Sequence, residues 1–139
     1  MPKQAPGYSA KPLSAKLGIA EDSVVTTISA PADYDTMVAP PKGVRVSSRL
    51  SADARFIHLF STSRADLARA LPRARKAMAT DGVIWVSWPK KASGVKTDIT
   101  EDTIRELAFP LDLVDIKVCA VSDVWSGLKL MIRKERRAK

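Results

Sequence analysis

Basic and aromatic side chains gather in one short stretch of the sequence. Lys90, Lys91 and Lys96 lie within seven residues, directly after Trp88 and Pro89. Lysine ammonium groups attract phosphates and carboxylates, and a proline restricts the backbone before it. The stretch therefore indicates a loop that recognises an anion. The alternative interpretation is a solvated loop, which is the commoner place for charged side chains.

Residue types and spacing exclude several other chemistries. The chain has one histidine, His58, and one cysteine, Cys119, so zinc sites built from these ligands and an internal disulfide are excluded. His58 lies between Ile57 and Leu59, where a buried, hydrogen-bonded imidazole is commoner than a catalytic one. The glycines are too far apart for a dinucleotide fingerprint or a P-loop. No catalytic residue can be assigned, and we predict neither a metal nor a cofactor.

Most of the net charge of +8 lies at the two ends of the chain. Residues 1–18 contain lysines and no acid, residues 133–139 contain five cations and one acid, and residues 19–132 are nearly neutral. Basic ends of this kind are more often solubilising tails than recognition elements. Specific nucleic-acid binding is therefore not expected, although the tail should attract phosphates loosely.

Length and composition predict one α/β domain in a chain of 139 residues. We expect an N-terminal extension with a short helix over residues 1–18, a domain over residues 19–132, and a basic tail over residues 133–139. The start of the sequence lacks the apolar segment of a signal peptide, and no run reaches the roughly 18 apolar residues of a membrane span. These features predict a cytoplasmic protein without a membrane segment.

Strand and helix patterns alternate along the chain. β-Branched, apolar or alternating runs predict strands at residues 24–28, 44–48, 55–60, 83–88, 114–120 and 128–132. Helices are predicted near residues 12–18 and 33–38, from residue 63 onward, and from residue 98 to 108. This order predicts a three-layer, Rossmann-like, mostly parallel sheet of about six strands that ends in an antiparallel β-hairpin.

Two single residues and one pair of residues predict where two of the helices begin and whether one of them is interrupted. Ser63 should cap the helix that follows it, and Asp98 with Glu101 should form a capping box for the next helix. Pro72 lies inside the first of these helices and should kink it or break it into two segments.

Two turns carry predictions about the strands. Asp81 and Gly82 should turn the chain into the strand at residues 83–88. The connection between residues 48 and 55 is shorter than the roughly dozen residues of a usual parallel crossover. Three alternatives therefore stay open for the second strand: it is very short, it is antiparallel, or it is not a strand.

Four stretches of the sequence resemble a bacterial family of small proteins with no assigned function. They read WPKKASG (88–94), TDITED (97–102), VDIKVCAV (114–121) and WSGLKL (125–130), and residues 8–19 and 63–67 fit the same family. The order of elements is also similar to the Rossmann-like fold of S-adenosylmethionine-dependent methyltransferases. That wider resemblance implies a sheet with the strand order two, one, three, four, six, five.

Two cofactor determinants of those methyltransferases are missing from this sequence. Their glycine-rich turn after the first strand is replaced by residues 29–32, SAPA, and their acidic residue after the second strand is replaced by Arg49. We therefore predict a Rossmann-like domain that binds an anionic small molecule or partner. One alternative is a divergent or degenerate S-adenosylmethionine-dependent methyltransferase, and another is a nucleic-acid accessory protein held by its basic tail.

The predicted site lies at the carboxyl ends of the strands, where parallel α/β sheets bind ligands. Eleven residues are expected there: Arg49, Ser61, Ser63, Arg64, Trp88, Lys90, Lys91, Ser93, Gly94, Trp125 and Ser126. The four cations among them would surround the positive amino ends of the helices that begin near Ser63 and Thr100, which favours an anion. The alternative is a set of unrelated loop and turn residues. A homodimer paired through a sheet edge is a further prediction.

Overall fold

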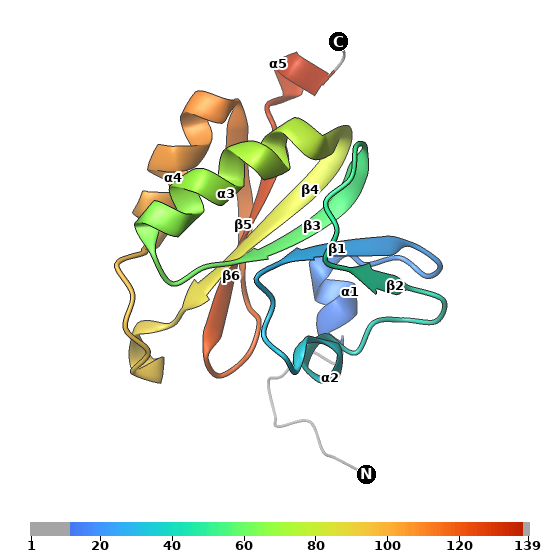
Figure 1. The fold of residues 1–139 in the computed structure, drawn as a ribbon, viewed down its shortest axis with the longest axis horizontal. Helices are drawn as coiled ribbons and strands as arrows, with labels where there is room; N and C mark the ends of the chain where they lie inside the picture. Colours follow the sequence, from blue (N-terminus) through green and yellow to red (C-terminus); the bar gives the residue numbers. More distant parts are fainter. Residues whose placement is uncertain (1–11, 138–139) are drawn as a thin grey trace.

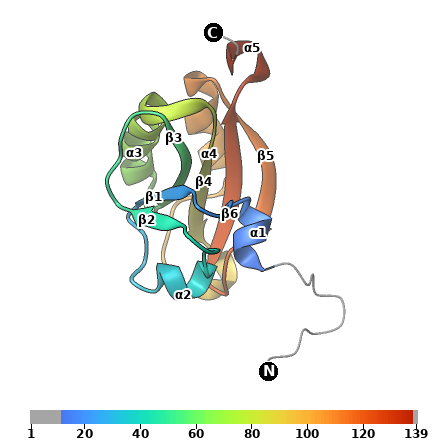
Figure 2. The same cartoon turned by 90° about the vertical axis from the view of Figure 1, so that its right-hand side faces the viewer.

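A computed structural model describes residues 12–137 and places a six-stranded sheet between two layers of helices (Figures 1 and 2). The strands are β1 (Val24–Ile28), β2 (Arg45–Ser47), β3 (Ala54–Phe60), β4 (Met78–Pro89), β5 (Leu113–Ala120) and β6 (Trp125–Ile132). The α-helices are α1 (Leu13–Leu17), α2 (Tyr34–Val38), α3 (Arg64–Ala77), α4 (Glu101–Ala108) and α5 (Lys134–Arg137). Two 3₁₀ turns complete the elements, η1 (Lys91–Ser93) and η2 (Phe109–Leu111).

The strand order is β2-β1-β3-β4-β6-β5, which confirms the order that the methyltransferase resemblance implies. β2, β1, β3 and β4 pair in parallel, whereas β6 is antiparallel to both of its neighbours, β4 and β5. The sheet is therefore mixed, and the prediction of a mostly parallel sheet holds for the first four strands. The closing hairpin is confirmed.

β2 is a very short parallel strand, which decides between the three alternatives for this segment. Ser47 at its end lies level with Thr26 of β1, and Thr26 lies level with Ile57 of β3. β3 begins at Ala54, only three residues before that level. The connection from β2 to β3 therefore has to return only a short distance along the strand direction. Six extended residues reach roughly 20 Å, which covers this distance and two strand spacings of about 4.8 Å each.

β4 begins five residues earlier than predicted, because Met78 also pairs with β3, at Ala54. The pairing register shifts between Ala54 and Phe56, so the predicted Asp81-Gly82 turn is instead an irregularity inside the strand. A Cβ atom on Gly82 would lie 3.0 Å from the carbonyl oxygen of Ala54. Glycine is therefore required here by close backbone approach, not by a turn.

α3 continues through Pro72 as one helix, so the predicted break is wrong. A proline in a helix removes one hydrogen bond to the carbonyl four residues earlier, here that of Ala68. Both residues are exposed, so the unpaired carbonyl faces the solvent side of the helix. The side of α3 that faces the sheet carries Leu67, Leu71 and Ala74, which are buried.

Each face of the sheet carries its own apolar cluster. One cluster joins the sheet to α3 and α4 and includes Leu71 and Ile104. The other joins the sheet to α1 and α2 and includes Leu17 and Val38. The short helix expected in an N-terminal extension thus packs into the protein, while the division at residues 18 and 132 stays a prediction. Residues 1–11 and 138–139 lie outside the described part.

Polar side chains on the central strands are paired inside the protein. Burial lowers the pKa of His58 to about 3, so its imidazole is neutral at physiological pH. Its Nδ1 lies 2.9 Å from the Tyr34 hydroxyl and its Nε2 lies 2.8 Å from the Ser87 hydroxyl. The indole N–H of Trp85 donates to the carbonyl oxygen of Leu17 at 2.9 Å. These bonds confirm His58 as a buried, hydrogen-bonded residue, and they fix α1 and α2 to the sheet.

The two outer strands of the sheet are β2 and β5. β5 exposes Ile116 and Val118, and its pairing with β6 is irregular between Asp115 and Lys117. Nothing tests the predicted homodimer through a sheet edge, so it stays a prediction. Within residues 12–137, no helix has the length and apolar character needed to cross a membrane.

The buried His58 makes stability depend on pH. The unfolded chain binds a proton on this imidazole below about pH 6.5, whereas the folded chain binds it only near pH 3. Between these values the unfolded state holds more protons, so the free energy of unfolding falls as the pH falls, by at most about 1.4 kcal/mol per pH unit. Urea unfolding at pH 7.5, 6.5, 5.5 and 5 measures this slope.

The control is His58→Gln, which removes the only histidine of the chain. This variant should be less stable than the parent at pH 7.5 but should show little change between pH 7 and pH 5, so the difference between the two proteins should shrink as the pH falls. An equal slope in both proteins would show that other groups cause the pH dependence.

Candidate functional site

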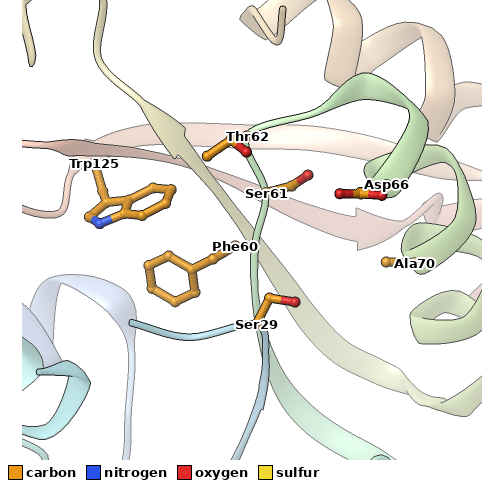
Figure 3. A pocket seen from close by; sticks show the side chains of 7 residues that line it. All are labelled: Ser29, Phe60, Ser61, Thr62, Asp66, Ala70 and Trp125. Carbon is orange, nitrogen blue, oxygen red and sulfur yellow. The ribbon is translucent and has the colours of Figure 1, made fainter. Parts of the chain in front are cut away.

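A cavity of about 230 Å³ opens at the carboxyl ends of β1 and β3 (Figure 3). After β1 the chain crosses to β2 on one side, whereas β3 lies on the other side of β1. Ligands of open α/β sheets bind at such a reversal of strand order. We call this hollow the switch-point cavity, and its lining residues are Ser29, Phe60, Ser61, Thr62, Asp66, Ala70 and Trp125.

The turn after β1 forms one side of the switch-point cavity. Ser29 has a φ of +58°, in the left-handed region that a non-glycine residue seldom adopts. Pro31 follows two residues later, and its carbonyl accepts the amide of Tyr34 at 3.1 Å at the start of α2. Tyr34 in turn bonds to His58 on β3. The strained turn is therefore held in place from the core side.

Two aromatic rings form the opposite wall. Phe60 and Trp125 meet edge to face, with ring centroids 5.0 Å apart, and Phe60 also stacks on His58 at 4.3 Å. Trp125 is fixed by the tight hairpin loop, since the Ser122 hydroxyl accepts its amide at 3.1 Å. Figure 3 shows the two rings side by side and the hydroxyl groups of Ser29 and Ser61 facing the other part of the cavity. The cavity therefore offers both an aromatic and a polar surface.

The polar part of the lining is acidic. Asp66, in the first turn of α3, is the one charged residue among those that line the switch-point cavity. Its carboxylate also pairs with Arg69, one turn further along the same helix. Carboxylate and hydroxyl oxygens accept hydrogen bonds, so this surface suits a hydrogen-bond donor such as an amine or hydroxyl group.

The start of α3 is already occupied by an acid of the chain itself. Ser63 caps α3 as predicted, accepting the amide of Asp66 at 3.2 Å. The neighbouring amide of Arg64 donates to the Asp98 carboxylate at 2.7 Å. The predicted capping box of Asp98 with Glu101 is therefore wrong, because Asp98 caps α3 rather than α4. Short hydrogen bonds of this kind take the place that an anion would have at a helix start.

α4 is capped by two threonines instead. The amide of Thr103 donates to the Thr100 hydroxyl at 3.3 Å, and the amide of Thr100 donates to the Thr103 hydroxyl at 3.1 Å. Two acids, Glu101 and Asp102, lie in the first turn and complement the helix dipole. Both pair with Arg105, which also pairs with Asp115. The amino end of α4 is thus also satisfied internally.

The eleven predicted site residues lie at the expected edge but not in one pocket. Ser61 and Trp125 line the switch-point cavity. Trp88 and Lys91 line a separate hollow of about 540 Å³ beside the start of α4. Trp88 packs against the α3 and α4 layer, whereas Trp125 packs with the α1 and α2 cluster. The two indoles face opposite sides of the sheet because Trp88 pairs with Ser126, the residue after Trp125.

The other predicted site residues have separate local roles. Arg49, after β2, donates its amide to the Ser47 hydroxyl, and the Arg64 guanidinium pairs with Glu106 at 2.9 Å. The Ser93 hydroxyl donates to the Lys90 carbonyl, and Gly94 ends η1 with a φ of +79°. The four predicted cations therefore do not surround one helix start.

Two hydrogen bonds connect the lysine loop, residues 90–96, and the residue after it to the neighbourhood of the switch-point cavity. The Lys90 amide donates to the Val124 carbonyl at 2.6 Å, next to Trp125. Just beyond the loop, the Thr97 hydroxyl donates to the Thr62 carbonyl at 2.7 Å. Within residues 12–137, none of the three lysines of this loop forms an ion pair with a carboxylate.

Sequence reasoning missed several lining residues, including Ser29, Phe60 and Asp66. The first two follow from position, because Ser29 directly follows β1 and Phe60 ends β3. Asp66 lies in the first turn of α3, where an acid complements the helix dipole, and nothing local marks it as facing a cavity. In the described part of the chain, no group of three or more histidine, cysteine, aspartate or glutamate side chains could hold a metal ion.

Solved structures with a similar fold are methyltransferases and related proteins. A protein classed as a type 11 methyltransferase from Sulfolobus solfataricus has a TM-score of 0.56 at 11% identity, over 83% of this chain and 86% of that one. The neocarzinostatin O-methyltransferase NcsB1, solved with S-adenosylmethionine, has a TM-score of 0.54 at 18% identity, over 86% of this chain and 50% of that one. LepI, also solved with S-adenosylmethionine, has a TM-score of 0.55 at 13% identity, over 95% and 50%. Against these last two, the chain spans about half of the longer protein.

Together, the sheet order and these neighbours define a Rossmann-like α/β protein with the methyltransferase type of fold. The chain belongs to the family DUF3052, described as a protein of unknown function, whose model matches residues 48–134. The predicted resemblance to a family without an assigned function is thereby confirmed. No curated protein matches the sequence.

The contact between Asp98 and α3 predicts a stability effect. Asp98→Ala leaves the Arg64 amide without its acceptor, so the free energy of unfolding should fall by about 0.5–2 kcal/mol, as for the loss of a helix cap. Urea unfolding measures the change. The control is Asp102→Ala, which removes one exposed ion pair of Arg105 and should cost less than about 0.5 kcal/mol. Equal losses would show that Asp98 does not cap α3.

Proposed function

We propose that this protein binds a small organic molecule at the carboxyl edge of its sheet. An amine or hydroxyl group of the ligand enters the switch-point cavity, and an acidic group of the same ligand lies against the lysine loop. The ligand is anionic or zwitterionic, and binding rather than a chemical step is the function that the site supports best.

The observation that carries the proposal is the opposite chemistry of two joined surfaces. The lining of the switch-point cavity holds Asp66 and three hydroxyl residues but no cation. The adjoining lysine loop holds three cations without carboxylate partners within the described residues. The bonds from Thr97 to Thr62 and from Lys90 to Val124 tie the two surfaces together. One ligand with two different polar groups satisfies both.

The size of the cavity favours a small ligand. Its volume of about 230 Å³ is below the roughly 300–1,000 Å³ of pockets that hold drug-sized molecules. Trp125, whose ring packs against the buried ring of Phe60, offers a ring surface to an apolar or aromatic part of the ligand, which aromatic side chains bind well.

The residues present do not fit S-adenosylmethionine, the cofactor that the fold type implies. The turn after β1 consists of Ser29, Ala30 and Pro31, so Cβ atoms and a proline ring stand where a glycine-rich turn would let the backbone approach a cofactor. Arg49 follows β2 where an acid would bind ribose hydroxyl groups. We therefore derive no methyl-transfer step.

A degenerate methyltransferase is the second candidate, and the similarity to NcsB1 and LepI, both solved with S-adenosylmethionine, favours it. Calorimetric titration of S-adenosylmethionine and S-adenosylhomocysteine into the protein separates the two candidates. We expect no saturable heat of binding up to about 1 mM of either compound. This result would mean that the binding free energy is no more favourable than about −4 kcal/mol. Micromolar binding of either compound would favour the methyltransferase over the proposed function.

Three probes with the same ring test the proposed site: L-phenylalanine, 2-phenylethylamine and 3-phenylpropionate. L-Phenylalanine has both polar groups, so it should shift the NMR signals of the Trp125 indole and the Thr62 amide at millimolar concentration. Each probe with one polar group should bind at least about tenfold more weakly, because a hydrogen bond to a charged group contributes roughly 1.5–3 kcal/mol.

Two variants assign the polar groups of the probes. Asp66→Asn should remove the advantage that the amine gives, and Lys90→Ala with Lys91→Ala should remove the advantage that the carboxylate gives. The matched control is Asp81→Asn. Asp81 is also an exposed acid paired with an arginine, Arg55, but it lies in the first part of β4 and does not line the switch-point cavity. Equal binding of the three probes, or shifts away from Trp125, would rule the proposed site out.

A further inference from the structure

The end of the sheet opposite the switch-point cavity carries a dense group of cations. α5 projects from this end of the molecule beyond β6, and α3 ends at the same edge of the sheet (Figures 1 and 2). The basic residues contributed by these two helices and the residue before α5 are Arg75, Lys76, Arg133, Lys134, Arg136 and Arg137. We call this set the amino-edge basic cluster.

Main-chain contacts hold the amino-edge basic cluster together around residues 111 and 112. The Arg75 guanidinium, from α3, donates to the Leu111 carbonyl at 2.8 Å. The Arg133 amide donates to the carbonyl of Asp112 at 2.7 Å. The Arg137 guanidinium donates to the Ile132 carbonyl at 2.7 Å. The cations therefore belong to one ordered surface that three elements build.

Two acidic side chains, Asp112 and Glu135 of α5, do not balance the six cations. The Asp112 carboxylate is shared by Arg133 at 3.9 Å and Arg136 at 3.7 Å, both too long for good hydrogen bonds. Within residues 12–137, Lys76 and Lys134 pair with no carboxylate. Most of the guanidinium and ammonium donors thus face solvent, where they can bind phosphates.

An exposed aromatic ring lies next to the cations. Phe109, at the start of η2, has 51% of its surface exposed. It lines a hollow of about 310 Å³ together with Val114 and Arg133. An aromatic ring beside arginines can stack on a nucleobase while the guanidinium groups bind the flanking phosphates.

We propose that the amino-edge basic cluster binds single-stranded nucleic acid without sequence preference. A single strand is favoured over a duplex because Phe109 can stack only on a base that is not already stacked in a helix. Binding to a lipid surface is less favoured, because α5 has four residues and none of them is buried or apolar. This surface lies at the other end of the sheet, so the inference does not depend on the proposed small-molecule site.

Fluorescence anisotropy with labelled oligonucleotides of fifteen deoxythymidines or fifteen uridines tests the inference on the full chain. Both strands should bind, and the affinity should fall linearly with salt on logarithmic axes between 50 and 200 mM KCl, by roughly 0.7 in slope per neutralised phosphate. Comparison of the two strands shows whether DNA or RNA binds more tightly. A fifteen-base-pair duplex and vesicles of phosphatidylcholine with one quarter phosphatidylserine complete the set.

Two variants separate charge from stacking. Lys76→Ala with Lys134→Ala should reduce the salt slope by about 1.4, because two phosphate contacts are lost. Phe109→Ala should weaken binding at least about fivefold at an unchanged slope, as the loss of a stacked base does. The matched control is Lys42→Ala with Arg45→Ala, which removes two exposed cations near β2 and should leave the affinity unchanged.

Three results would overturn the inference. The first is an equal loss of affinity in the control and in the two-lysine variant, because net charge alone would then explain binding. The second is binding of the duplex at least as tight as that of single strands, with no effect of Phe109→Ala. The third is binding of the vesicles without binding of either oligonucleotide.

Discussion

Burial of the central strands on both faces is the constraint on which the rest of the structure depends. A polar side chain on β3 or β4 must find its partner inside the protein, because an unpaired one costs roughly 1–3 kcal/mol. His58 therefore bonds to Tyr34 and Ser87, and Trp85 bonds to the Leu17 carbonyl. In the described part, every buried side-chain nitrogen and oxygen has a partner. These few bonds determine where α1 and α2 attach to the sheet, and hence where the turn after β1 lies.

The switch-point cavity follows from that constraint. Because Tyr34 anchors α2 over His58, the connecting residues 29–33 must turn sharply, and Ser29 adopts a left-handed conformation to do so. Phe60, stacked on His58, then faces Trp125 across the end of β3. A turn with free glycines could approach a cofactor closely, whereas this turn is fixed by the core. The same core contacts that stabilise the fold thus separate this site from that of a methyltransferase with the usual glycine-rich turn.

The sequence predicted the elements well, since apolar runs, β-branched runs and helix caps are local signals, whereas the strand order followed from the resemblance to methyltransferases. Apart from the break expected at Pro72, the errors concern long-range contacts, which lie outside local patterns. Asp98 has the spacing of a capping box with Glu101, yet its carboxylate accepts the amide of Arg64, thirty-four positions away. The start of β4 depends on a register shift against β3, which no turn motif reports. Trp88 and Trp125 follow from strand ends, but their separation onto opposite faces depends on the one-residue offset of the β4 and β6 register.

The two ends of the sheet differ in how their charges are used. At the carboxyl edge, acids of the chain occupy the helix starts: Asp98 caps α3, and Glu101 with Asp102 lies in the first turn of α4. In the described part of the chain, the cations without an ion pair at this edge include Arg49 and the three lysines of the lysine loop, and none of them lines the cavity. At the amino edge, the helix ends attract cations instead, and α3 ends in Arg75 and Lys76. α5 adds its own cations at the same edge of the sheet. The Asp112 carboxylate there is shared by Arg133 and Arg136, at 3.9 and 3.7 Å. Helix polarity, together with the cations of the lysine loop and α5, thus separates the two proposed sites onto opposite edges of the sheet.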